Sequence, residues 1–429
     1  MDGLNRRELL SVAAAAGVGL LLGRIGLGQE RMARGEDVEI ALVGTGEQGR
    51  HLMADCLKIP GVRFRAVCDI WPYHQTYSSN VLKRHGQPVN VYEDYRQMLQ
   101  KERTLAAVIV ATPDWMHAEQ AIGCLKAGKH VYCEKAMAPN PADAAAMVRA
   151  ARESGRLLQI GTHRRSSPMY QHARKLIQED KILGRVTNAY AQWNRPMRAE
   201  VSWSKQYELD PAVLKQYGYG SMQEFRNWRW FRKYCSGPMA DVGVHQVDVL
   251  NWFLSATPSS VLASAGQDYY KGGDWYDTIQ ASYEYATPAG PVRALYQALN
   301  TTSFGDSYEA FLGDQRTLVV SEQASQCFLV REVSAKPLAW EDQAPHFLWM
   351  GKDAIKLEAP ATSQPASQPA SDKSPHQYHL ENFFAAIGGQ AKLNCPAEVA
   401  YASTVSALKA NDAIAAEAKV KFKPEDFRV

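Results

Sequence analysis

The N-terminal part of the chain alternates short, β-branched apolar runs with longer stretches of helical pattern. Such runs predict buried parallel strands, here at residues 38–43, 62–68, 106–111, 130–133 and 157–160. Two intervening stretches, residues 72–84 and 116–127, lack glycine clusters and internal proline and end close to Gly86 and Gly128, as helices commonly end. This succession predicts βαβ units on a parallel sheet over residues 35–161.

After Gly161 the pattern changes to longer segments in which apolar and polar residues alternate. These segments lie at residues 186–193, 261–267, 278–285, 292–300 and 308–312. Together with the turn at Gly313-Asp314 before residues 317–320, the alternation favours an antiparallel or mixed sheet. Helical patterns follow at residues 379–387 and 397–418. We therefore predict an α/β protein of two domains, the second being an α+β domain over residues 162–429.

Two segments fall outside this pattern. Residues 359–376 repeat Ser-Gln-Pro-Ala, which buries too little apolar surface to be ordered, so we predict a mobile loop. Near the N-terminus, Arg6-Arg7 precedes an apolar stretch at residues 11–23 that is short for a membrane-spanning helix. We interpret residues 1–34 as a twin-arginine export signal with a spacer, the alternative being an uncleaved anchor or a frayed apolar end. The signal predicts a periplasmic protein without further membrane contact.

Charge and cysteine content exclude several classes of protein. The 48 basic and 45 acidic side chains give a net charge of +3, which offers no basic surface for nucleic acid. The seven cysteines form no C-x-x-C pair and lie mostly in apolar runs. We therefore predict buried free thiols rather than disulfides or metal ligands, and no metal site.

A glycine-rich turn follows the first predicted strand. Gly44, Gly46 and Gly49 form a G-x-G-x-x-G motif, and Asp69 stands 20 residues beyond Gly49 at the end of the second strand. In a Rossmann domain such glycines form a tight turn and let the backbone approach a pyrophosphate, while the carboxylate binds ribose hydroxyls. We therefore predict a dinucleotide site, a plain strand-end turn being the alternative for Asp69. Residues 70–72 include no arginine for a 2′-phosphate, which favours NAD, with NADP as the alternative.

Two later runs carry a family resemblance. Residues 108–117 (VIVATPDWMH) and 127–136 (AGKHVYCEKA) closely resemble the glucose-fructose oxidoreductase, inositol dehydrogenase and rhizopine catabolism (Gfo/Idh/MocA) family. The resemblance covers nearly the whole chain after the signal. It implies a Rossmann domain and a C-terminal α+β domain whose open, mainly antiparallel sheet often makes oligomer contacts. It also implies a homo-oligomer, dimer or tetramer, and a small-molecule carbohydrate substrate oxidised or reduced with NAD or NADP.

The family's Glu-Lys-Pro motif matches Glu134-Lys135-Ala136, with alanine in place of proline. The resemblance gives Lys135 the role of an ammonium beside the nicotinamide that stabilises a developing alkoxide. Its place at the carboxyl end of a predicted strand agrees, because ligands of open α/β sheets bind there. A solvated surface lysine is the alternative, and the missing proline leaves the geometry of this turn open.

Residues 237–248 (GPMADVGVHQVD) contain the other catalytic candidates. On a helix, Asp241, His245 and Asp248 share one face, so the carboxylate of Asp241 can hold and polarise the imidazole. The pattern resembles the family's Asp-x-x-x-His motif, in which the histidine handles the hydroxyl proton and the aspartate supports it. An imidazole with an ordinary pKa of about 6.5 suits such a base. A satisfied polar pair is the alternative interpretation.

These motifs define three sets of predicted site residues. The catalytic candidates are Lys135, Asp241 and His245. The cofactor-binding candidates are Gly44, Gly46, Glu47, Gln48, Gly49, Asp69, Thr112, Pro113, His117, Glu134, Lys135 and Arg164. The substrate candidates, chosen because aromatic rings and polar donors suit sugars, are His163, Trp193, Asn194, Trp228, Arg229 and Asp248. Core or interface packing is the alternative for the aromatic ones.

The expected activity is NAD-dependent hydride transfer on a sugar, polyol or sugar derivative. An exported enzyme has no NAD pool to exchange with, so we expect the cofactor to stay tightly bound. Two reactions satisfy that demand: oxidation of one sugar followed by reduction of another, or a redox-neutral glycosidase or lyase reaction through a transient keto-sugar. The third alternative is a non-catalytic dinucleotide- or sugar-binding protein, which the joint presence of Lys135, Asp241 and His245 disfavours.

Overall fold

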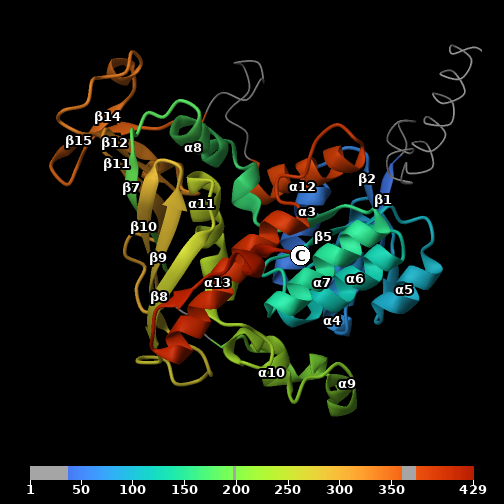
Figure 1. Cartoon of the computed structure of the whole chain (residues 1–429). Helices are drawn as coiled ribbons and strands as arrows, with labels where there is room; N and C mark the ends of the chain where they lie inside the picture. Colours follow the sequence, from blue (N-terminus) through green and yellow to red (C-terminus); the bar gives the residue numbers. More distant parts are fainter. Residues whose placement is uncertain (1–36, 197–199, 360–372) are drawn as a thin grey trace, which may run out of the picture.

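The computed structural model describes residues 37–196, 200–359 and 373–429 (Figure 1). The export signal predicted at residues 1–34 and residues 360–372 of the predicted loop lie outside this range. The last two residues of the predicted loop, Pro375 and His376, belong to helix α12 (Pro375–Ile387). Ser374 begins that helix by accepting a hydrogen bond from Gln377 N.

Within residues 37–196, the parallel N-terminal sheet has six strands in the order β3-β2-β1-β4-β5-β6. They are β1 (Val38–Val43), β2 (Val62–Cys68), β3 (Asn90–Tyr92), β4 (Ala107–Val110), β5 (His130–Cys133) and β6 (Leu158–Ile160). Only β3 was missed, because three residues at a sheet edge carry too little pattern. Val43 lies beside Cys68 on one side and Val110 on the other, so β1, β2 and β4 end at one edge.

Helices cover both faces of this sheet, as the βαβ pattern predicts. They are α3 (Glu47–Cys56), α4 (Pro72–Arg84), α5 (Tyr95–Lys101), α6 (His117–Lys126) and α7 (Pro141–Ser154). Local sequence signals set their ends: Asn140 caps α7 before Pro141, and Gly155 ends it in the left-handed conformation at a φ of 64°. A short 3₁₀ turn, η1 (Asp114–Met116), precedes α6.

Among the described residues, the C-terminal sheet has ten strands in the order β14-β15-β13-β12-β11-β7-β10-β9-β8-β16. They are β7 (Val186–Asn194), β8 (Pro258–Gly266), β9 (Thr278–Thr287), β10 (Gly290–Leu299), β11 (Ser307–Gly313), β12 (Arg316–Val320), β13 (Phe328–Arg331), β14 (His346–Trp349), β15 (Lys352–Lys356) and β16 (Val420–Lys421). The β7–β10 pair is parallel and its neighbours are antiparallel. The predicted open, mainly antiparallel sheet is therefore confirmed.

Three helices pack on one face of the C-terminal sheet: α8 (Pro168–Gln178), α11 (Val244–Leu254) and α13 (Ala397–Ala416). Figure 1 shows α11 and α13 between this sheet and the N-terminal domain. Ala407 of α13 belongs to the core under the C-terminal sheet, whereas Val405 packs with α6 and α7. Helix α13 therefore joins the two cores.

Helix α12 departs from the predicted division at residue 162. Its apolar residues Leu380, Phe383 and Phe384 pack against the N-terminal sheet beside Tyr132. The helix thus lies on the Rossmann domain although it comes late in the chain. Burial of this apolar face, rather than chain order, decides where the helix packs.

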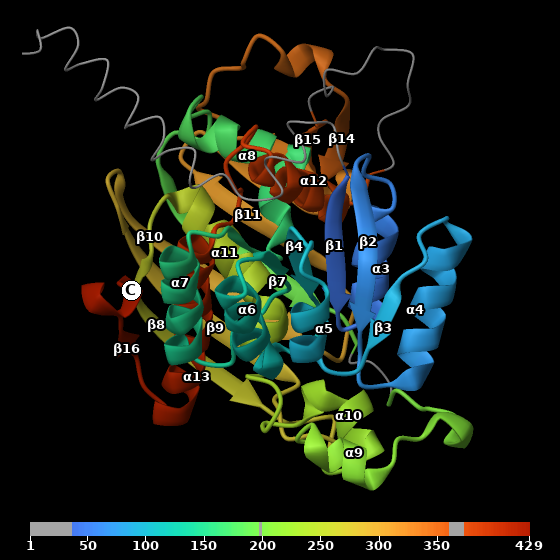
Figure 2. The same cartoon turned by 90° about the vertical axis from the view of Figure 1, so that its right-hand side faces the viewer.

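The segment of residues 201–235 was not predicted as structured. It contains η3 (Lys205–Tyr207), α9 (Pro211–Gln216), α10 (Met222–Arg226) and η4 (Trp228–Trp230). Asp210 and Ser221 cap its two short helices through their side chains. Figure 2 shows α9 and α10 at the lower end of the N-terminal sheet.

Over the described residues, all seven cysteines are buried and free, which confirms that prediction. In the same ranges, no helix is long and apolar enough to cross a membrane. The described residues also contain no cluster of three or more His, Cys, Asp or Glu side chains able to hold a metal ion.

Candidate active site

A cavity of about 900 Å³ lies between the carboxyl edge of the N-terminal sheet, the 201–235 segment and the C-terminal domain. This is where open α/β sheets bind ligands. Most of the predicted site residues line it: Gly44, Gly46, Glu47, Gln48, Asp69, Thr112, Pro113, Glu134, Lys135, His163, Trp193, Trp228, Arg229, Asp241 and His245. The tertiary structure therefore brings residues from both halves of the chain to one place.

The glycine motif forms an open cradle at the start of α3. Gly44 has a φ of 86°, and a Cβ there would lie 2.7 Å from the carbonyl carbon of Ala111. A Cβ on Gly49 would overlap the carbonyl oxygen of Gly44. At Gly46, by contrast, the nearest atom would be His74 Cε1 at 3.6 Å, and no described side chain caps the helix. Backbone N–H groups at a helix start therefore face an open space that fits a pyrophosphate.

Asp69 stands beside this cradle at the end of β2. Its carboxylate accepts hydrogen bonds from Thr45 N at 2.8 Å and Trp71 N at 2.9 Å, and His74 Nδ1 lies 3.2 Å from Oδ2. Burial alone would raise the pKa of Asp69, but His74 and the backbone donors lower it. The carboxylate is therefore ionised and held where the ribose of a Rossmann-bound dinucleotide lies.

Glu134 links the cradle to the end of β5. Gln48 Nε2 donates to Glu134 Oε1 at 3.0 Å, and Lys135 N donates to Oε2 at 3.1 Å. Burial raises the pKa of this carboxyl. A Cβ on Gly161 would lie 2.8 Å from Glu134 Oε2, so the residue after β6 must be glycine for Glu134 to occupy this place.

Lys135 reaches across the cavity to the C-terminal domain. Its Nζ donates to Asp241 Oδ1 at 2.9 Å and to the Asp241 carbonyl at 2.6 Å. On the other side, Arg229 Nε lies 3.2 Å from Asp241 Oδ2. Against the effect of burial, these two cations hold the pKa of Asp241 well below its usual range. The Lys135–Ala136 peptide bond, at the position of the family proline, is cis.

The prediction that Asp241 supports His245 is wrong. Residues 239–243 form a π-helical turn, η5 (Met239–Gly243), before α11 begins. Asp241 and His245 therefore do not lie on one regular α-helix, as the prediction assumed. Asp241 binds Lys135 and Arg229 instead, while His245 packs beside Trp193 and His163, at 6.2 Å and 5.0 Å between ring centroids.

His245 has the environment of a neutral imidazole. Its Nδ1 is buried without a hydrogen-bond partner among the described residues. Burial, and after it the positive charges of His163, Lys135 and Arg164, lower its pKa well below the usual value. The side chain lines the cavity and is unprotonated at neutral pH, which is the state that a proton acceptor needs.

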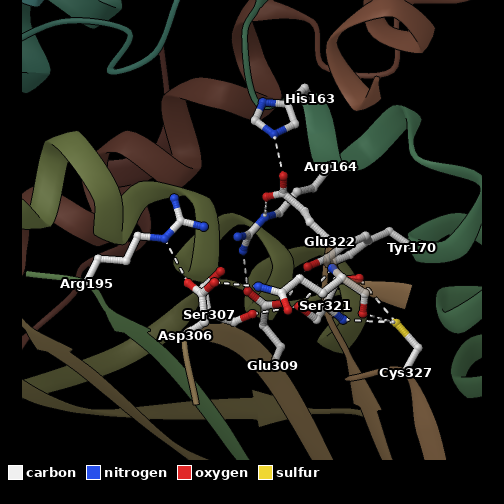
Figure 3. Close-up of polar contacts among 11 residues, drawn as sticks. His163, Arg164, Tyr170, Arg195, Asp306, Ser307, Glu309, Ser321, Glu322 and Cys327 are labelled. Atoms are coloured by element: carbon white, nitrogen blue, oxygen red, sulfur yellow. Dashed lines mark hydrogen bonds and ion pairs between the residues drawn. The ribbon is translucent and has the colours of Figure 1, made fainter. Parts of the chain in front are cut away.

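Arg164 is not a cofactor contact, which corrects the prediction. Figure 3 shows its guanidinium between Glu309 and Glu322, and the residue does not line the cavity. Its Nε donates to Glu322 Oε1 at 2.7 Å, its Nη1 pairs with Glu309, and only 1% of the side chain is exposed. The buried carboxylate of Glu309 and the partly exposed carboxylate of Glu322 hold this charge, because a buried guanidinium must be paired. The predicted substrate residue His163 binds the other oxygen of Glu322, with Nε2 at 3.4 Å from Oε2.

Three further predicted residues have structural contacts instead of lining the cavity. Asp248 forms a buried ion pair with Arg165 at 2.8 Å, since α11 turns that side toward the domain interior. Asn194 is buried and donates to the Phe304 carbonyl at 2.9 Å. The two ring nitrogens of His117 lie 2.7 Å and 2.8 Å from the carbonyl oxygens of Ala136 and Thr112, between the loops after β5 and β4, and the neutral imidazole can donate to one of them.

The charged cavity residues that were missed at the sequence level include Arg50, Arg226 and Glu322, and Arg195, next to two predicted substrate residues, lines the cavity as well. Arg195 stacks on Trp193, with 4.6 Å from Cζ to the ring centroid, and pairs with Asp306. Glu322 follows strand β12, where no motif marks it. Arg50 directly follows Gly49 of the glycine motif, and this position is the one sequence signal that could have marked it as a cavity residue.

These features define a two-domain protein with an NAD-binding Rossmann domain. Residues 38–162 match the family model "Oxidoreductase family, NAD-binding Rossmann fold", and residues 170–323 match "GFO/IDH/MocA C-terminal domain". The chain belongs to the GFO/IDH/MocA family of NAD-binding oxidoreductases, as the sequence resemblance predicted.

The individual relatives have low sequence identity to this chain. The inositol 2-dehydrogenase of Rubrobacter xylanophilus is 27% identical over 200 residues, which cover 46% of this chain and 52% of that protein. The chain thus spans about half the length of this curated relative. A levoglucosan dehydrogenase in complex with NADH and levoglucosan has a TM-score of 0.70 at 18% identity, covering 90% of this chain and 100% of that one. An aldose-aldose oxidoreductase of Caulobacter crescentus, complexed with glycerol, has a TM-score of 0.68 at 19% identity with the same coverages. These two structures share the fold.

Proposed function

We propose that this chain is an NAD-dependent enzyme that transfers hydride to or from a hydroxyl-bearing carbon of a sugar, polyol or sugar derivative. The observation that carries the proposal is one cavity lined by Lys135 of the Rossmann domain and His245 of the C-terminal domain, next to the glycine cradle. The relatives named above, which act on inositol, levoglucosan and aldoses by their names, support the substrate class.

Each residue of the site has its own role in the proposed reaction. Bound NAD supplies the hydride acceptor. Lys135 presents an ammonium that stabilises negative charge on the reacting oxygen, and Asp241 with Arg229 positions it. Neutral His245 takes the hydroxyl proton while the hydride leaves the same carbon. Trp193 and Trp228 offer flat apolar faces to the sugar ring, and Glu322 offers an ionised acceptor for its other hydroxyls.

We further propose that the dinucleotide stays bound between turnovers. Retention would let the enzyme work by oxidising one sugar and reducing another, or by a redox-neutral cleavage through a keto-sugar. The test is to purify the protein, assay dinucleotide released on denaturation, and follow a panel of sugars and glycosides by NMR without added cofactor. Paired oxidised and reduced sugars would support the first reaction, and cleaved glycosides the second. A purified protein that releases no dinucleotide on denaturation would contradict retention. A protein that converts none of the sugars or glycosides, even when NAD is supplied, would contradict the proposed activity.

The pH dependence of the reaction offers a check on His245. A proton acceptor must be unprotonated, and the pKa of His245 is lowered below 6.5. We therefore expect the single-turnover rate of NAD reduction to stay level as the pH falls to 6.5 and to decline only in more acidic solution. Asp114 is the competing group, because burial and the charge of Asp241 raise its pKa to about 7. A decline near pH 7 that Asp114→Asn removes would assign the titration to Asp114 instead.

Export by the twin-arginine route is likewise a proposal, supported by Arg6 and Arg7 ahead of an apolar stretch. Lysine at both positions should leave the protein in the cytoplasm, because the export machinery reads the guanidinium pair. Cell fractionation followed by immunoblotting measures this, with Arg24→Lys as the control outside the motif. Unchanged export of the double variant would point to another route. The homo-oligomer implied by the family resemblance stays a prediction.

A further inference from the structure

We propose that the 201–235 segment encloses the adenosine half of the bound dinucleotide, and that Arg226 and Phe225 of α10, with Arg50 of α3, contact it. The inference rests on the proposed function, since it concerns the same cofactor. It assigns retention to a part of the chain that lies outside the glycine motif and outside the catalytic residues.

The segment packs directly on the residues that follow Asp69. Trp71 Nε1 donates to the Tyr207 carbonyl at 2.5 Å, and the ring of Trp71 meets Phe225 edge-on at 5.8 Å between centroids. Arg226 lies over the same indole, with 4.7 Å from Cζ to the ring centroid. Because Asp69 marks the ribose of the adenosine, Phe225 and Arg226 lie beside the place where the adenosine binds.

A second set of contacts spans the rest of the carboxyl edge. Tyr217 donates from its hydroxyl to Glu93 Oε1 at 2.9 Å, just beyond β3. Tyr219 meets Trp115, which follows β4, edge-on at 5.6 Å. Trp71 shares one apolar cluster with the segment's buried residues, and Trp115 packs against that cluster. The segment is therefore attached on both sides of the cavity, after β2 and β3 and after β4.

At this end of the cavity, one guanidinium donor has no partner within the described part of the protein. Arg226 Nε is buried and has no hydrogen-bond partner among the described residues. Burial and the nearby charge of Arg50 lower the pKa of Arg226, so two guanidinium groups face the same space. The carboxylates whose charges act on Arg226 are those of Asp69 and Glu47, and the oxygens of Asp69 already accept hydrogen bonds from Thr45 and Trp71. Donors without acceptors in a cavity indicate a ligand with acceptor atoms.

The adenosine half of NAD offers what these residues lack. Its ribose hydroxyls and ring nitrogens accept hydrogen bonds, and the adenine face suits an arginine plane and an aromatic ring. At the opposite end of the cavity, Lys135 and Arg229 are already paired with Asp241. Among these guanidinium and ammonium groups, the buried donor that lacks a partner within the described residues is therefore Arg226 Nε, at the adenosine end, where it adds affinity without entering the reaction.

Exchange of the bound dinucleotide tests this inference without relying on activity. Purified holoenzyme is mixed with excess isotopically labelled NAD, and bound NAD is measured over time by mass spectrometry after rapid gel filtration and denaturation. Arg226→Gln should exchange its NAD at least about tenfold faster than the wild type, because it loses a stacking and donor group. The control, Arg232→Gln, removes another segment arginine stacked on a tryptophan, Trp275 at 4.1 Å, but one that does not line the cavity. Its exchange rate should stay at the wild-type value.

Two outcomes would overturn the inference. One is a wild-type exchange rate in Arg226→Gln, and the other is equal acceleration in Arg226→Gln and Arg232→Gln, which would reflect general loosening. Thermal unfolding of each variant shows whether the fold is intact, and Phe225→Leu provides a second, uncharged variant with the same expectation of faster exchange. If purified wild-type protein contains no bound NAD, retention itself is overturned. If the protein is inactive but exchanges its bound NAD slowly, the proposed activity is contradicted and this inference stands.

Discussion

Replacing His245 with alanine is expected to slow hydride transfer by a factor of about 10²–10⁴ while NAD stays bound. The imidazole is buried, unprotonated and lines the cavity, so its loss leaves the hydroxyl proton without an acceptor. Cofactor binding should survive, because the cradle at Gly44 and Gly46 lies on the other domain. The measurement is NAD reduction in a single turnover with a reactive sugar, because steady-state rates can reflect product release.

The matched comparison for this variant is Asp241→Asn. Asp241 contacts Lys135 and Arg229 rather than His245, so its substitution leaves the Lys135 ammonium less firmly positioned. The rate of hydride transfer should therefore fall less than in His245→Ala. Since both groups serve one chemical step, the double variant should be less impaired than the product of the single effects. A wild-type rate in His245→Ala would remove this residue from the mechanism and leave Lys135 or a tyrosine as the base.

Replacing Gly46 with valine is expected to abolish dinucleotide retention while the protein stays folded. A Cβ at Gly46 meets no protein atom closer than 3.6 Å, so the added atoms point into open space rather than into the fold. That space is where the pyrophosphate approaches the backbone of the α3 N-terminus, and a side chain there prevents the contact. The quantity to measure is NAD released on denaturation per mole of protein.

Substitutions at two other glycines distinguish a loss of NAD binding from a loss of stability. Gly49→Ala should lower the unfolding temperature, because its Cβ would overlap the carbonyl oxygen of Gly44. Gly272→Val lies outside the cavity lining, with 3.7 Å to the nearest atom, and should keep a full complement of NAD. Gly46→Val that retains all of its NAD would show that the cofactor does not approach this turn.

Much of the catalytic site was accessible from the sequence because its residues occur in short motifs. Lys135 follows a buried strand, and Gly44, Gly46 and Gly49 follow another, so local pattern alone places them at the carboxyl edge of the parallel sheet. Arg164 and Asp248 were misassigned for a different reason. Each is a charged residue near a motif, and only the packing of α8, α11 and β11 shows that each is used in a buried ion pair.

The sequence by itself determined that strands and helices alternate over residues 38–160 and that a glycine motif follows the first strand, because each of these patterns depends on residues a few positions apart. The pairing of Lys135 with Asp241 and the place of Arg226 beside Trp71 were decided only by the tertiary structure. These pairs join positions more than a hundred residues apart, and no local periodicity encodes a contact of that kind. Likewise, Asp241 lies in a π-helical turn just before α11 begins, and its spacing from His245 in the sequence does not reveal that turn.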